Sequence, residues 1–307
     1  MILVWGSTDD APVTHVLDAL AFIDCDTFHL DDAAIPTVRY DLRLGPRPSG
    51  WFEVGDRRIH IREVEAIYLR PGEQTGTAVS TSAALLAVAG SVTATVVNRP
   101  AAGRSNLSKP FQLSLIADAG FGTPDTLVTS DVSAARDFLS RHGRIVYKSI
   151  SGCRSIVSVI DAASKYELDR MGHGPVQLQQ WIDGLDVRVH VVGERSFATS
   201  IASPATDYRY VVTGEATLAV APFDLPEGLA RKLVALVQGM GLIFAGIDLR
   251  LTRGGDWVCF EVNPSPGFTY YEDQTGQPIA RAIAELLVGA DHHHFHHHTS
   301  PRERQGA

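Results

Sequence analysis

Apolar and polar positions in the first hundred residues follow the pattern of strands separated by helices. Residues 2–5 form an apolar run, and Val13, Val16 and Leu20 then recur at the spacing of one helical face. By the same reasoning we expect strands at 27–30, 65–70 and 96–98, hairpins within 37–60, and a helix over 79–90. A strand that leads through a helix into another strand is typical of a parallel sheet. The pattern therefore predicts a small, largely parallel sheet in this part of the chain.

A second unit begins near residue 98. Ser108 stands at an expected helix N-cap, Pro110 falls in the first turn, and Gly120 ends the helix. Residues 226–241 form a clear amphipathic helix. The remaining elements are expected as helices at 132–142 and 279–288 and as strands at 126–128, 144–149, 176–181, 185–192, 243–251 and 256–263. The chain is therefore predicted to be an α/β protein.

The composition is that of a folded, net acidic chain. Of the 307 residues, 45% are hydrophobic and 20% are charged, which is too apolar for a disordered protein. At roughly 150 residues per domain, the length predicts about two domains. Lys and Arg number 27 and Asp and Glu number 35, so the formal charge is 27 − 35 = −8. Because nucleic-acid binding needs clustered basic residues, we expect no nucleic-acid partner.

No targeting or membrane segment is expected. No stretch approaches the roughly 20 apolar residues of a membrane span, and residues 1–6 have the pattern of a strand rather than a signal peptide. Cys25, Cys153 and Cys259 lie too far apart for a zinc motif or a disulfide framework. These features predict reduced thiols and a cytoplasmic protein without a membrane partner.

A histidine-rich tract follows the last periodic helix. Six of the twelve histidines fall within residues 292–298, before a polar segment. Such tracts can bind transition metals, but the position of this one favours an unstructured tail. We therefore expect residues 291–307 to be disordered, with metal binding as the alternative.

Two of the predicted strands combine acidic residues with a turn signal. The runs at 244–251 and 256–263 flank a Gly-Gly pair, which favours a two-residue hairpin turn. In that register Asp248 lies opposite Glu261, and Asn263 shares their face. Opposed Cβ atoms are about 5 Å apart, so two carboxylates there repel each other unless a cation or proton intervenes. Since Mg²⁺ prefers oxygen ligands, these side chains predict a magnesium site; the alternative is a solvated hairpin face.

Other charged residues stand at positions where they could meet a polyanion. Lys109 at a helix start and Lys148 on a strand carry point charges on flexible stems, which suit phosphate oxygens, although either could be an ordinary surface residue. In the strand at 185–192 the valines face one way, and Asp186 and Arg188 face the other way with His190. We expect the valines in the core and the polar residues at a cleft, or else a half-exposed strand.

Taken in order, these motifs resemble those of the ATP-grasp ligases over residues 98–287. The matching segments are 98–100, Lys109, 120–126, 146–152, 179–182, Asp186, Asp248 and 261–264. The resemblance implies an ATP-grasp fold of the α/β (α+β) class, in which central and C-terminal subdomains clasp ATP. It divides the chain into an N-terminal parallel-sheet subdomain (1–97), a central subdomain (98–180), a C-terminal subdomain (181–290) and the tail (291–307).

The resemblance also implies the site residues. Two lysines would contact phosphates, a loop would cover them, a hinge would read adenine through its backbone, and an acid would hold the ribose. The expected ATP contacts are Lys109, Lys148, Ser151, Gly152, Gln179, Gln180, Trp181, Ile182 and Asp186. The expected ligands of one or two Mg²⁺ ions are Asp248, Glu261 and Asn263.

Two positions depart from the family's pattern. The hinge has Gln180 where the family usually has Glu, so a side-chain bond to the adenine amino group would differ. The loop at 149–158 contains one glycine, Gly152, which weakens the argument for a backbone phosphate cradle.

Within the superfamily, the chain most resembles the peptide-modifying (graspetide or microviridin-type) maturases, with the glutamate-adding ligases as close relatives. The features that carry this resemblance lie at 67–71, 186–188, 207–209, 263–268, 271–273 and 275–278. It implies that ATP activates a carboxylate as an acylphosphate, which an amine or hydroxyl then attacks to give an amide or ester within a precursor peptide. A homodimer is also implied.

Arginines are the candidate catalytic residues, because guanidinium forks match carboxylate and phosphoryl groups. They are Arg188, Arg209 and Arg250, with Arg70 as a substrate-binding candidate; each could instead form a structural ion pair. Because an acylphosphate is labile in water, a closing lid is expected at 152–158.

Two alternatives for the function stay open. The enzyme could add an amino acid to a small molecule or a protein terminus, with a small carboxylate and amine as substrates. It could also be an ATP-binding scaffold with little ligase activity, although the intact set Asp248, Glu261 and Asn263 argues against this.

Overall fold

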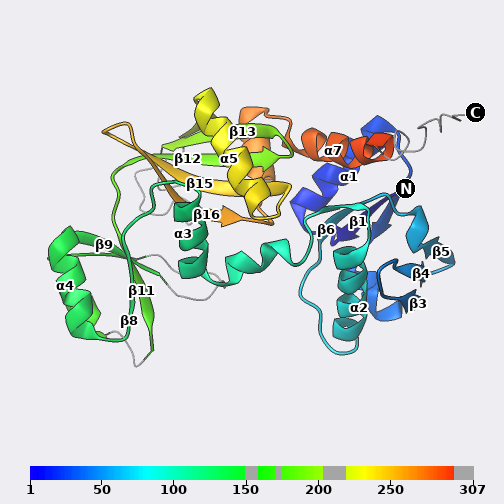
Figure 1. Cartoon of the computed structure of the whole chain (residues 1–307), viewed down its shortest axis with the longest axis horizontal. Coiled ribbons are helices and arrows are strands. Elements are labelled where there is room, and N and C mark those ends of the chain that lie inside the picture. Colours follow the sequence, from blue (N-terminus) through cyan, green and yellow to red (C-terminus); the bar gives the residue numbers. More distant parts are fainter. Residues whose placement is uncertain (149–157, 171–173, 203–218, 294–307) are drawn as a thin grey trace, which may run out of the picture. The chain divides into compact units, whose positions relative to one another are not determined.

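The structure is a computed structural model that describes residues 1–148, 158–170, 174–202 and 219–293. The chain forms two compact units. The first combines Met1–Ala101 with the segment from Pro278 onward, and the second is Ala102–Gln277. Figure 1 shows the elements of both. Among the described residues, no helix is both long enough and apolar enough to span a membrane.

A four-stranded parallel sheet forms the centre of the first unit, as the sequence predicts. Its order is β2-β1-β6-β7. The strands are β1 (Ile2–Gly6), β2 (Thr27–Leu30), β6 (Ala66–Arg70) and β7 (Thr95–Val97). The helices are α1 (Ala11–Ile23), α2 (Ala78–Ser91) and α7 (Ile279–His293). Helix α7 contacts α1 and β6, so the last helix belongs to this unit and not to the unit that precedes it in sequence.

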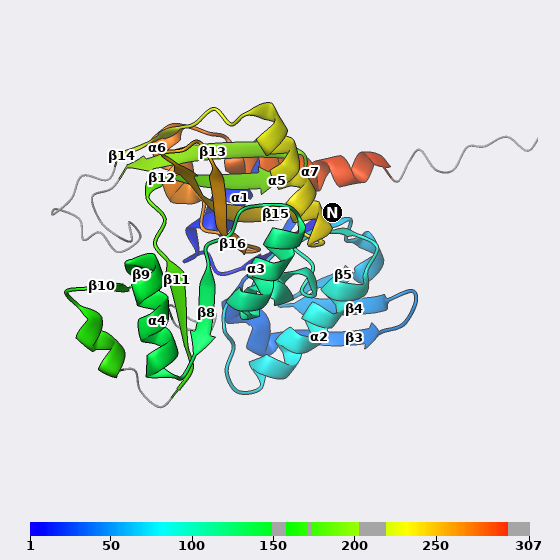
Figure 2. The same ribbon diagram turned by 60° about the vertical axis from the view of Figure 1, so that its left-hand side comes forward.

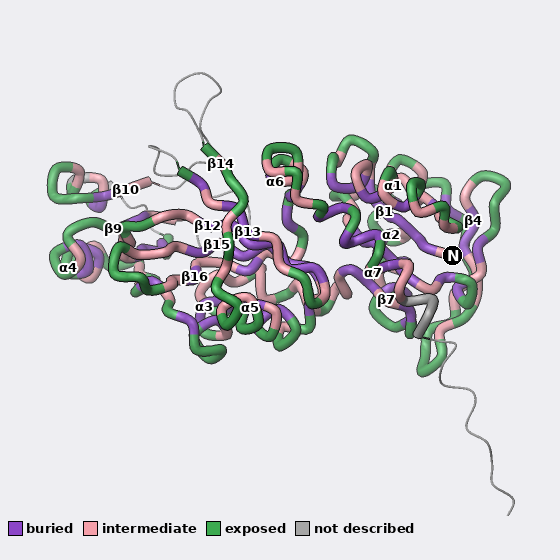
Figure 3. Tube along the Cα trace, turned by 90° about the horizontal axis from the view of Figure 1, so that it is seen from above, coloured by how far each residue is buried: buried purple, intermediate pink, exposed green. Residues whose placement is uncertain are grey.

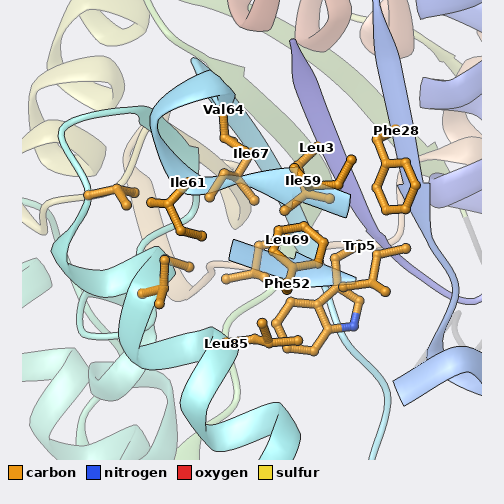
Figure 4. Packing of buried hydrophobic residues seen from close by; sticks show 14 of the residues in the cluster. Leu3, Trp5, Phe28, Phe52, Ile59, Ile61, Val64, Ile67, Leu69 and Leu85 are labelled. Atoms are coloured by element: carbon orange, nitrogen blue, oxygen red, sulfur yellow. The ribbon is translucent and has the colours of Figure 1, made fainter. Parts of the chain in front are cut away.

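An apolar core lies on one face of this parallel sheet. Trp5 of β1 packs with Leu85 of α2 and with Phe52 of a three-stranded antiparallel sheet (Figure 4). The strands of that sheet are β3 (Arg39–Arg43), β4 (Ser49–Val54) and β5 (Arg57–His60), which confirms the predicted hairpins. Short 3-10 helices lie at Asp32–Thr37 (η1) and Ile61–Glu63 (η2).

The second unit begins with η3 (Ala102–Leu107) and contains two antiparallel sheets. The first has the order β10-β9-β11-β8. Its strands are β8 (Thr126–Thr129), β9 (Arg144–Lys148), β10 (Ser158–Asp161) and β11 (Val176–Gln180). Helix α4 (Val132–His142) lies against one face of this sheet (Figure 2) and is in contact with η4 (Lys165–Arg170). Phe138, Ile145 and Leu178 pack together there. The opposite face carries Lys148 and Gln179, which belong to the candidate site.

The second sheet of this unit has five strands in the order β14-β13-β12-β15-β16. They are β12 (Gly184–Val192), β13 (Arg195–Ala202), β14 (Ala219–Pro222), β15 (Phe244–Thr252) and β16 (Trp257–Asn263). Helices α3 (Lys109–Asp118) and α5 (Glu227–Gly239) lie on one face of this sheet (Figure 1). Ile116 and Leu233 are buried in the apolar core there. Ser108 holds the N-cap position of α3, but its side chain makes no capping hydrogen bond.

The opposite face of the five-stranded sheet is partly covered by the chain that follows β16. Phe268 packs edge-on against Phe244 at 5.9 Å, and α6 (Thr269–Thr275) follows it. Gln277 accepts a hydrogen bond from Thr199 Oγ1 at 2.9 Å and donates one to the Ala198 carbonyl at 3.0 Å. This covering segment places Arg188 and His190 of β12 in the interior, where much of β12 is buried (Figure 3).

The hairpin of β15 and β16 differs from its predicted form at the turn. Thr252 N donates to the Asp256 carbonyl at 2.9 Å, so three residues form the turn, and Gly255 adopts φ +90°. The predicted two-residue turn is therefore wrong. A β-bulge between Asp248 and Leu249 then adds Phe260 to β16 and restores the predicted pairing of Asp248 with Glu261.

The outer edge of β16 is closed by the segment from α3 to β8. The buried side chain of Gln112 donates to the Val262 carbonyl at 2.7 Å and accepts from Val262 N at 3.0 Å. Cys259 N donates to the Gly122 carbonyl at 2.8 Å. Because these bonds satisfy an edge strand that carries Glu261 and Asn263, they also hold the candidate metal ligands in place.

Gln112→Leu is expected to lower the free energy of unfolding by about 2–4 kcal/mol, because it leaves a buried N–H and C=O of Val262 without partners. Chemical denaturation of the full chain measures this loss. The matched control is Gln238→Leu on the exposed side of α5, with an expected change within about 0.5 kcal/mol. Equal stability of the two variants would contradict the bridging role of Gln112.

Candidate functional site

Alternation along β12 separates the core from a polar face, as the sequence predicts. Val187, Val189 and Val191 are buried in the core with α3 and α5. Arg188 and His190 point to the opposite face but are also buried, at 7% and 0% exposure. The expectation that this polar set lines an open cleft is therefore wrong for His190, because the segment after β16 covers it.

Two ion pairs cross from β12 to β15. Asp186 lies opposite Arg250 and Arg188 lies opposite Asp248 in the strand register. Arg188 Nη1 donates to Asp248 Oδ1 at 2.6 Å, and Arg250 donates to Asp186 Oδ1 from Nε at 2.9 Å and Nη2 at 2.5 Å. Two of the predicted catalytic arginines, Arg188 and Arg250, thus pair with acids to which the resemblance gives a metal-binding or ribose-binding role.

The predicted metal ligands lie together on the same face. Asp248 is directly opposite Glu261, and Gly246 is directly opposite Asn263. Burial raises the pKa of the Cys259 thiol, and the charges of Asp248 and Glu261 raise it further. The carboxylates of Asp248 and Glu261 therefore both lie close enough to the buried Cys259 thiol to raise its pKa.

The donor set of this face suits one hard cation. The net formal charge of this face is 2 − 3 = −1, from two arginines (Arg188 and Arg250) and three acids (Asp186, Asp248 and Glu261). Two carboxylates and an amide oxygen are ligands that Mg²⁺ accepts, with further positions left to water or phosphate. Among the described residues, no group of three or more His, Cys, Asp or Glu could hold a metal.

Asn263 has a local partner that orients it. Its Oδ1 accepts a hydrogen bond from Ser265 N at 2.9 Å, which turns the carbonyl of the side chain into the tight Asn-Pro-Ser segment. A carbonyl oxygen has two lone pairs, so this bond leaves one for a cation.

The Arg188 guanidinium lies in a narrow space built by its neighbours. A Cβ at Gly246 would lie 2.2 Å from Arg188 Nη2 and 2.7 Å from Pro266 Cβ, so only glycine leaves room. The ring of Tyr271 lies 5.9 Å from Arg188 Cζ and 5.1 Å from the His190 ring. Burial, together with the Arg188 charge, lowers the pKa of His190 well below its usual value, so this imidazole is neutral.

Phe260, the extra residue of the bulge, connects the two sheets of the second unit. Its ring centroid lies 5.7 Å from Lys148 Nζ and 5.3 Å from Arg250 Cζ. The structure thus brings Lys148 of the first sheet next to the polar face of the second. Lys109 stands in the first turn of α3, as predicted.

The predicted adenine hinge links the two sheets. Gln180 N donates to the Asp125 carbonyl at 2.9 Å, and Trp181 N donates to the Arg144 carbonyl at 3.1 Å. Arg250 Nη1 donates to the Ile182 carbonyl at 2.5 Å. The Gln179 side chain is buried; its Nε2 donates to Thr126 Oγ1 at 3.2 Å, while its Oε1 has no hydrogen-bond partner among the described residues.

The Gln180 and Trp181 side chains have protein partners of their own. Gln180 Oε1 accepts from Asp125 N at 3.4 Å. Trp181 Nε1 donates to Asp183 Oδ1 at 2.7 Å, and the Arg144 guanidinium lies over the indole at 3.9 Å. The unusual glutamine of the hinge is therefore tied to the start of β8.

The remaining predicted residues lie elsewhere. Ser151, Gly152 and Arg209 fall outside the described residues, as do residues 152–157 of the expected lid and residues 294–307 of the tail. Arg70 ends β6 in the first unit, where its Nε donates to Asp10 Oδ2 at 2.6 Å.

Comparison with known proteins identifies the family of this site. The model of the RimK-like ATP-grasp domain matches residues 106–287, which is more than half of the chain and includes every predicted metal ligand. The chain belongs to the RimK-like ATP-grasp family. This confirms the resemblance and the α/β fold class predicted from the sequence.

The curated relatives of this RimK-like chain include glutamate ligases. A probable alpha-L-glutamate ligase of Cellvibrio japonicus is 32% identical over 199 residues, which cover 61% of this chain and 64% of that protein. The chain spans less than two thirds of the length of the curated relatives that it matches first.

Solved ATP-grasp structures share the fold over nearly the whole chain. One is macrocyclase MdnC bound with precursor peptide MdnA from Microcystis aeruginosa, at 23% identity and a TM-score of 0.77, covering 94% of this chain and 100% of that one. Another is ATP-grasp ligase PsnB complexed with a phosphomimetic variant of its minimal precursor, Mg and ADP, at 24% identity and a TM-score of 0.80, covering 94% and 98%. These likenesses confirm the fold.

Three residues of the site were not predicted as functional. Phe260 joins the site through a bulge that turn patterns do not reveal. Gly246 could have been suspected, because a glycine inside a buried strand often marks a close approach. His190 was placed on the correct face, but its burial depends on residues 264–277, which are distant in sequence.

Proposed function

We propose that this chain is an ATP-dependent ligase that joins a carboxylate to an amine, or to a hydroxyl, through an acylphosphate. The observation that carries the proposal is the opposed pair Asp248 and Glu261, with Asn263 beside them, on a face that also presents two arginines. Membership of the RimK-like ATP-grasp family supports it.

Lys109 and Lys148 are proposed to contact the phosphates of ATP, together with Ser151 and Gly152. The buried Oε1 of Gln179 fits a purine amino group, because it is an acceptor without a partner among the described residues. The backbone of Gln180, Trp181 and Ile182 would line the same base, and Asp186 would hold the ribose.

Asp248, Glu261 and Asn263 would hold one or two Mg²⁺ ions, which when bound offset the charge that develops on the transferred phosphoryl group. The substrate carboxylate attacks the γ-phosphorus of ATP, and ADP leaves. The amine or hydroxyl then attacks the acyl carbon, and phosphate leaves. Arg188, Arg209 and Arg250 would hold the anionic groups of these two steps, with Arg70 as a substrate contact.

For the substrate we propose a ribosomal precursor peptide whose side chains are joined. The likeness to macrocyclase MdnC, which is bound with a precursor peptide, supports this choice. The second candidate is the addition of an amino acid to a small molecule or a protein terminus, which the glutamate ligases among the relatives favour.

Mass spectrometry of candidate peptides incubated with the full chain and Mg-ATP separates the two candidates. We expect each new side-chain bond to remove the mass of one water from the peptide. A gain of one amino-acid residue would contradict ring closure and support the second candidate. Tight nucleotide binding without ADP formation for any carboxylate would support a scaffold.

Three further features stay proposals. They are the division into subdomains at 97/98 and 180/181, a homodimeric assembly, and a cytoplasmic location. The location is proposed because the reaction consumes ATP and Cys25 and Cys259 are unpaired thiols.

A further inference from the structure

The carboxylate of Asp248 has two candidate partners, a divalent cation and the Arg188 guanidinium. It is a proposed ligand of a divalent cation, and it accepts a hydrogen bond at 2.6 Å from the Arg188 guanidinium, whose side chain is 8% exposed. The Asp248 side chain is 24% exposed, so water screens the site only in part, and a guanidinium and a divalent cation on one carboxylate repel each other. The two partners are therefore expected to compete.

The surroundings of Arg188 allow it to change partner. His190 Nε2 lies 3.4 Å from Arg188 Nε, which donates to it, and 3.3 Å from the Gly267 carbonyl oxygen. One ring nitrogen cannot accept the first bond and donate the second at the same time, so a tautomer change exchanges Arg188 for Gly267. Nδ1 of the same ring is buried without a partner among the described residues, so no hydrogen bond at Nδ1 fixes the tautomer.

We propose that Asp248 exchanges Arg188 for the divalent cation, so that cation binding frees the guanidinium for an anionic group of the substrate. This inference rests on the proposed function and adds an order to it, in which the cation enters before the substrate carboxylate. Cation binding at Asp248 then raises the affinity of Arg188 for an anionic group of the substrate. By linkage, an anion bound to Arg188 raises the affinity of the site for the cation.

The test is the affinity of the full chain for Mn²⁺ alone, measured by electron paramagnetic resonance. If the ion pair is formed about nine-tenths of the time, its removal in Arg188→Met tightens Mn²⁺ binding about tenfold. The matched control is Arg250→Met, which removes an equal charge from the same face but leaves Asp248 paired; we expect at most about a twofold change, from the lost charge alone.

Inorganic phosphate provides a second readout. Added phosphate is expected to tighten Mn²⁺ binding more in the wild type than in Arg188→Met, because the variant has no guanidinium to occupy. If Arg188→Met does not fold, Arg188→Gln serves for both measurements, since it keeps a hydrogen-bonding side chain without the charge.

Unchanged or weaker Mn²⁺ binding by the Arg188 variants, with normal binding by the wild type, would overturn the exchange and leave the proposed function standing. Failure of every protein to bind Mn²⁺, even with ADP, would instead contradict the metal assignment on which both proposals rest.

Discussion

Glu261→Gln is expected to reduce carboxylate-dependent ADP formation at least about a hundredfold. Metal stabilisation of phosphoryl charge contributes several kcal/mol to such a reaction, and each 1.4 kcal/mol is about tenfold in rate. Glu261 supplies one of the two opposed carboxylates on the polar face of the five-stranded sheet. Its loss changes the net formal charge of that face from −1 to zero. The measurement is the rate of ADP release at saturating ATP over a range of Mg²⁺ concentrations.

The stability of the same variant separates a ligand from a structural residue. Because Glu261 lies opposite the like charge of Asp248, its neutralisation is expected to leave the melting temperature equal or higher. Glu227→Gln, on an exposed helical position paired with Arg231, is the control and should retain full activity. Full activity of Glu261→Gln at limiting Mg²⁺ would refute the metal assignment.

Gly246→Ala is expected to destabilise the second unit by about 2–4 kcal/mol and to abolish most activity. The added Cβ would lie 2.2 Å from Arg188 Nη2 and 2.6 Å from Cζ, so the guanidinium must leave and its buried pair with Asp248 breaks. Denaturant unfolding of the full chain measures the loss.

Gly254→Ala in the turn of the same hairpin is the matched control. Its nearest neighbour would be Asp256 Oδ2 at 3.6 Å, an ordinary contact, so little change is expected. In the double variant Gly246→Ala/Arg188→Met the two losses should not add, because both remove the same ion pair. Additive losses would show that the alanine clashes with Pro266 rather than with Arg188.

The hairpin of β15 and β16 shows both the reach of sequence reasoning and its limit. The pairing of Asp248 with Glu261 was predicted correctly from a two-residue turn that does not exist. The real turn is one residue longer, and the bulge at Phe260 compensates for it. Alternation and spacing along the sequence can place two acids on one face of a sheet. A bulge depends instead on the tertiary contacts of the extra side chain, which for Phe260 are with Lys148 and Arg250.

Alternation along β12 likewise predicted which residues share a face but not how that face is covered. The valines lie in the core as expected, because period-two alternation is a local property. The burial of His190 depends on Gly267 and Tyr271, more than seventy residues later in the chain. The ion pairs of Arg188 and Arg250 depend on the pairing of β12 with β15, which a list of candidate arginines cannot supply.

The proposed role of the polar face of the five-stranded sheet is to activate a carboxylate by phosphoryl transfer. The most direct test is the product stoichiometry when the full chain modifies a carboxylate-containing peptide with Mg-ATP. We expect one ADP and one phosphate for each water lost from the peptide, with no ADP when the carboxylate is omitted. Release of AMP and pyrophosphate, or bond formation without nucleotide cleavage, would contradict it.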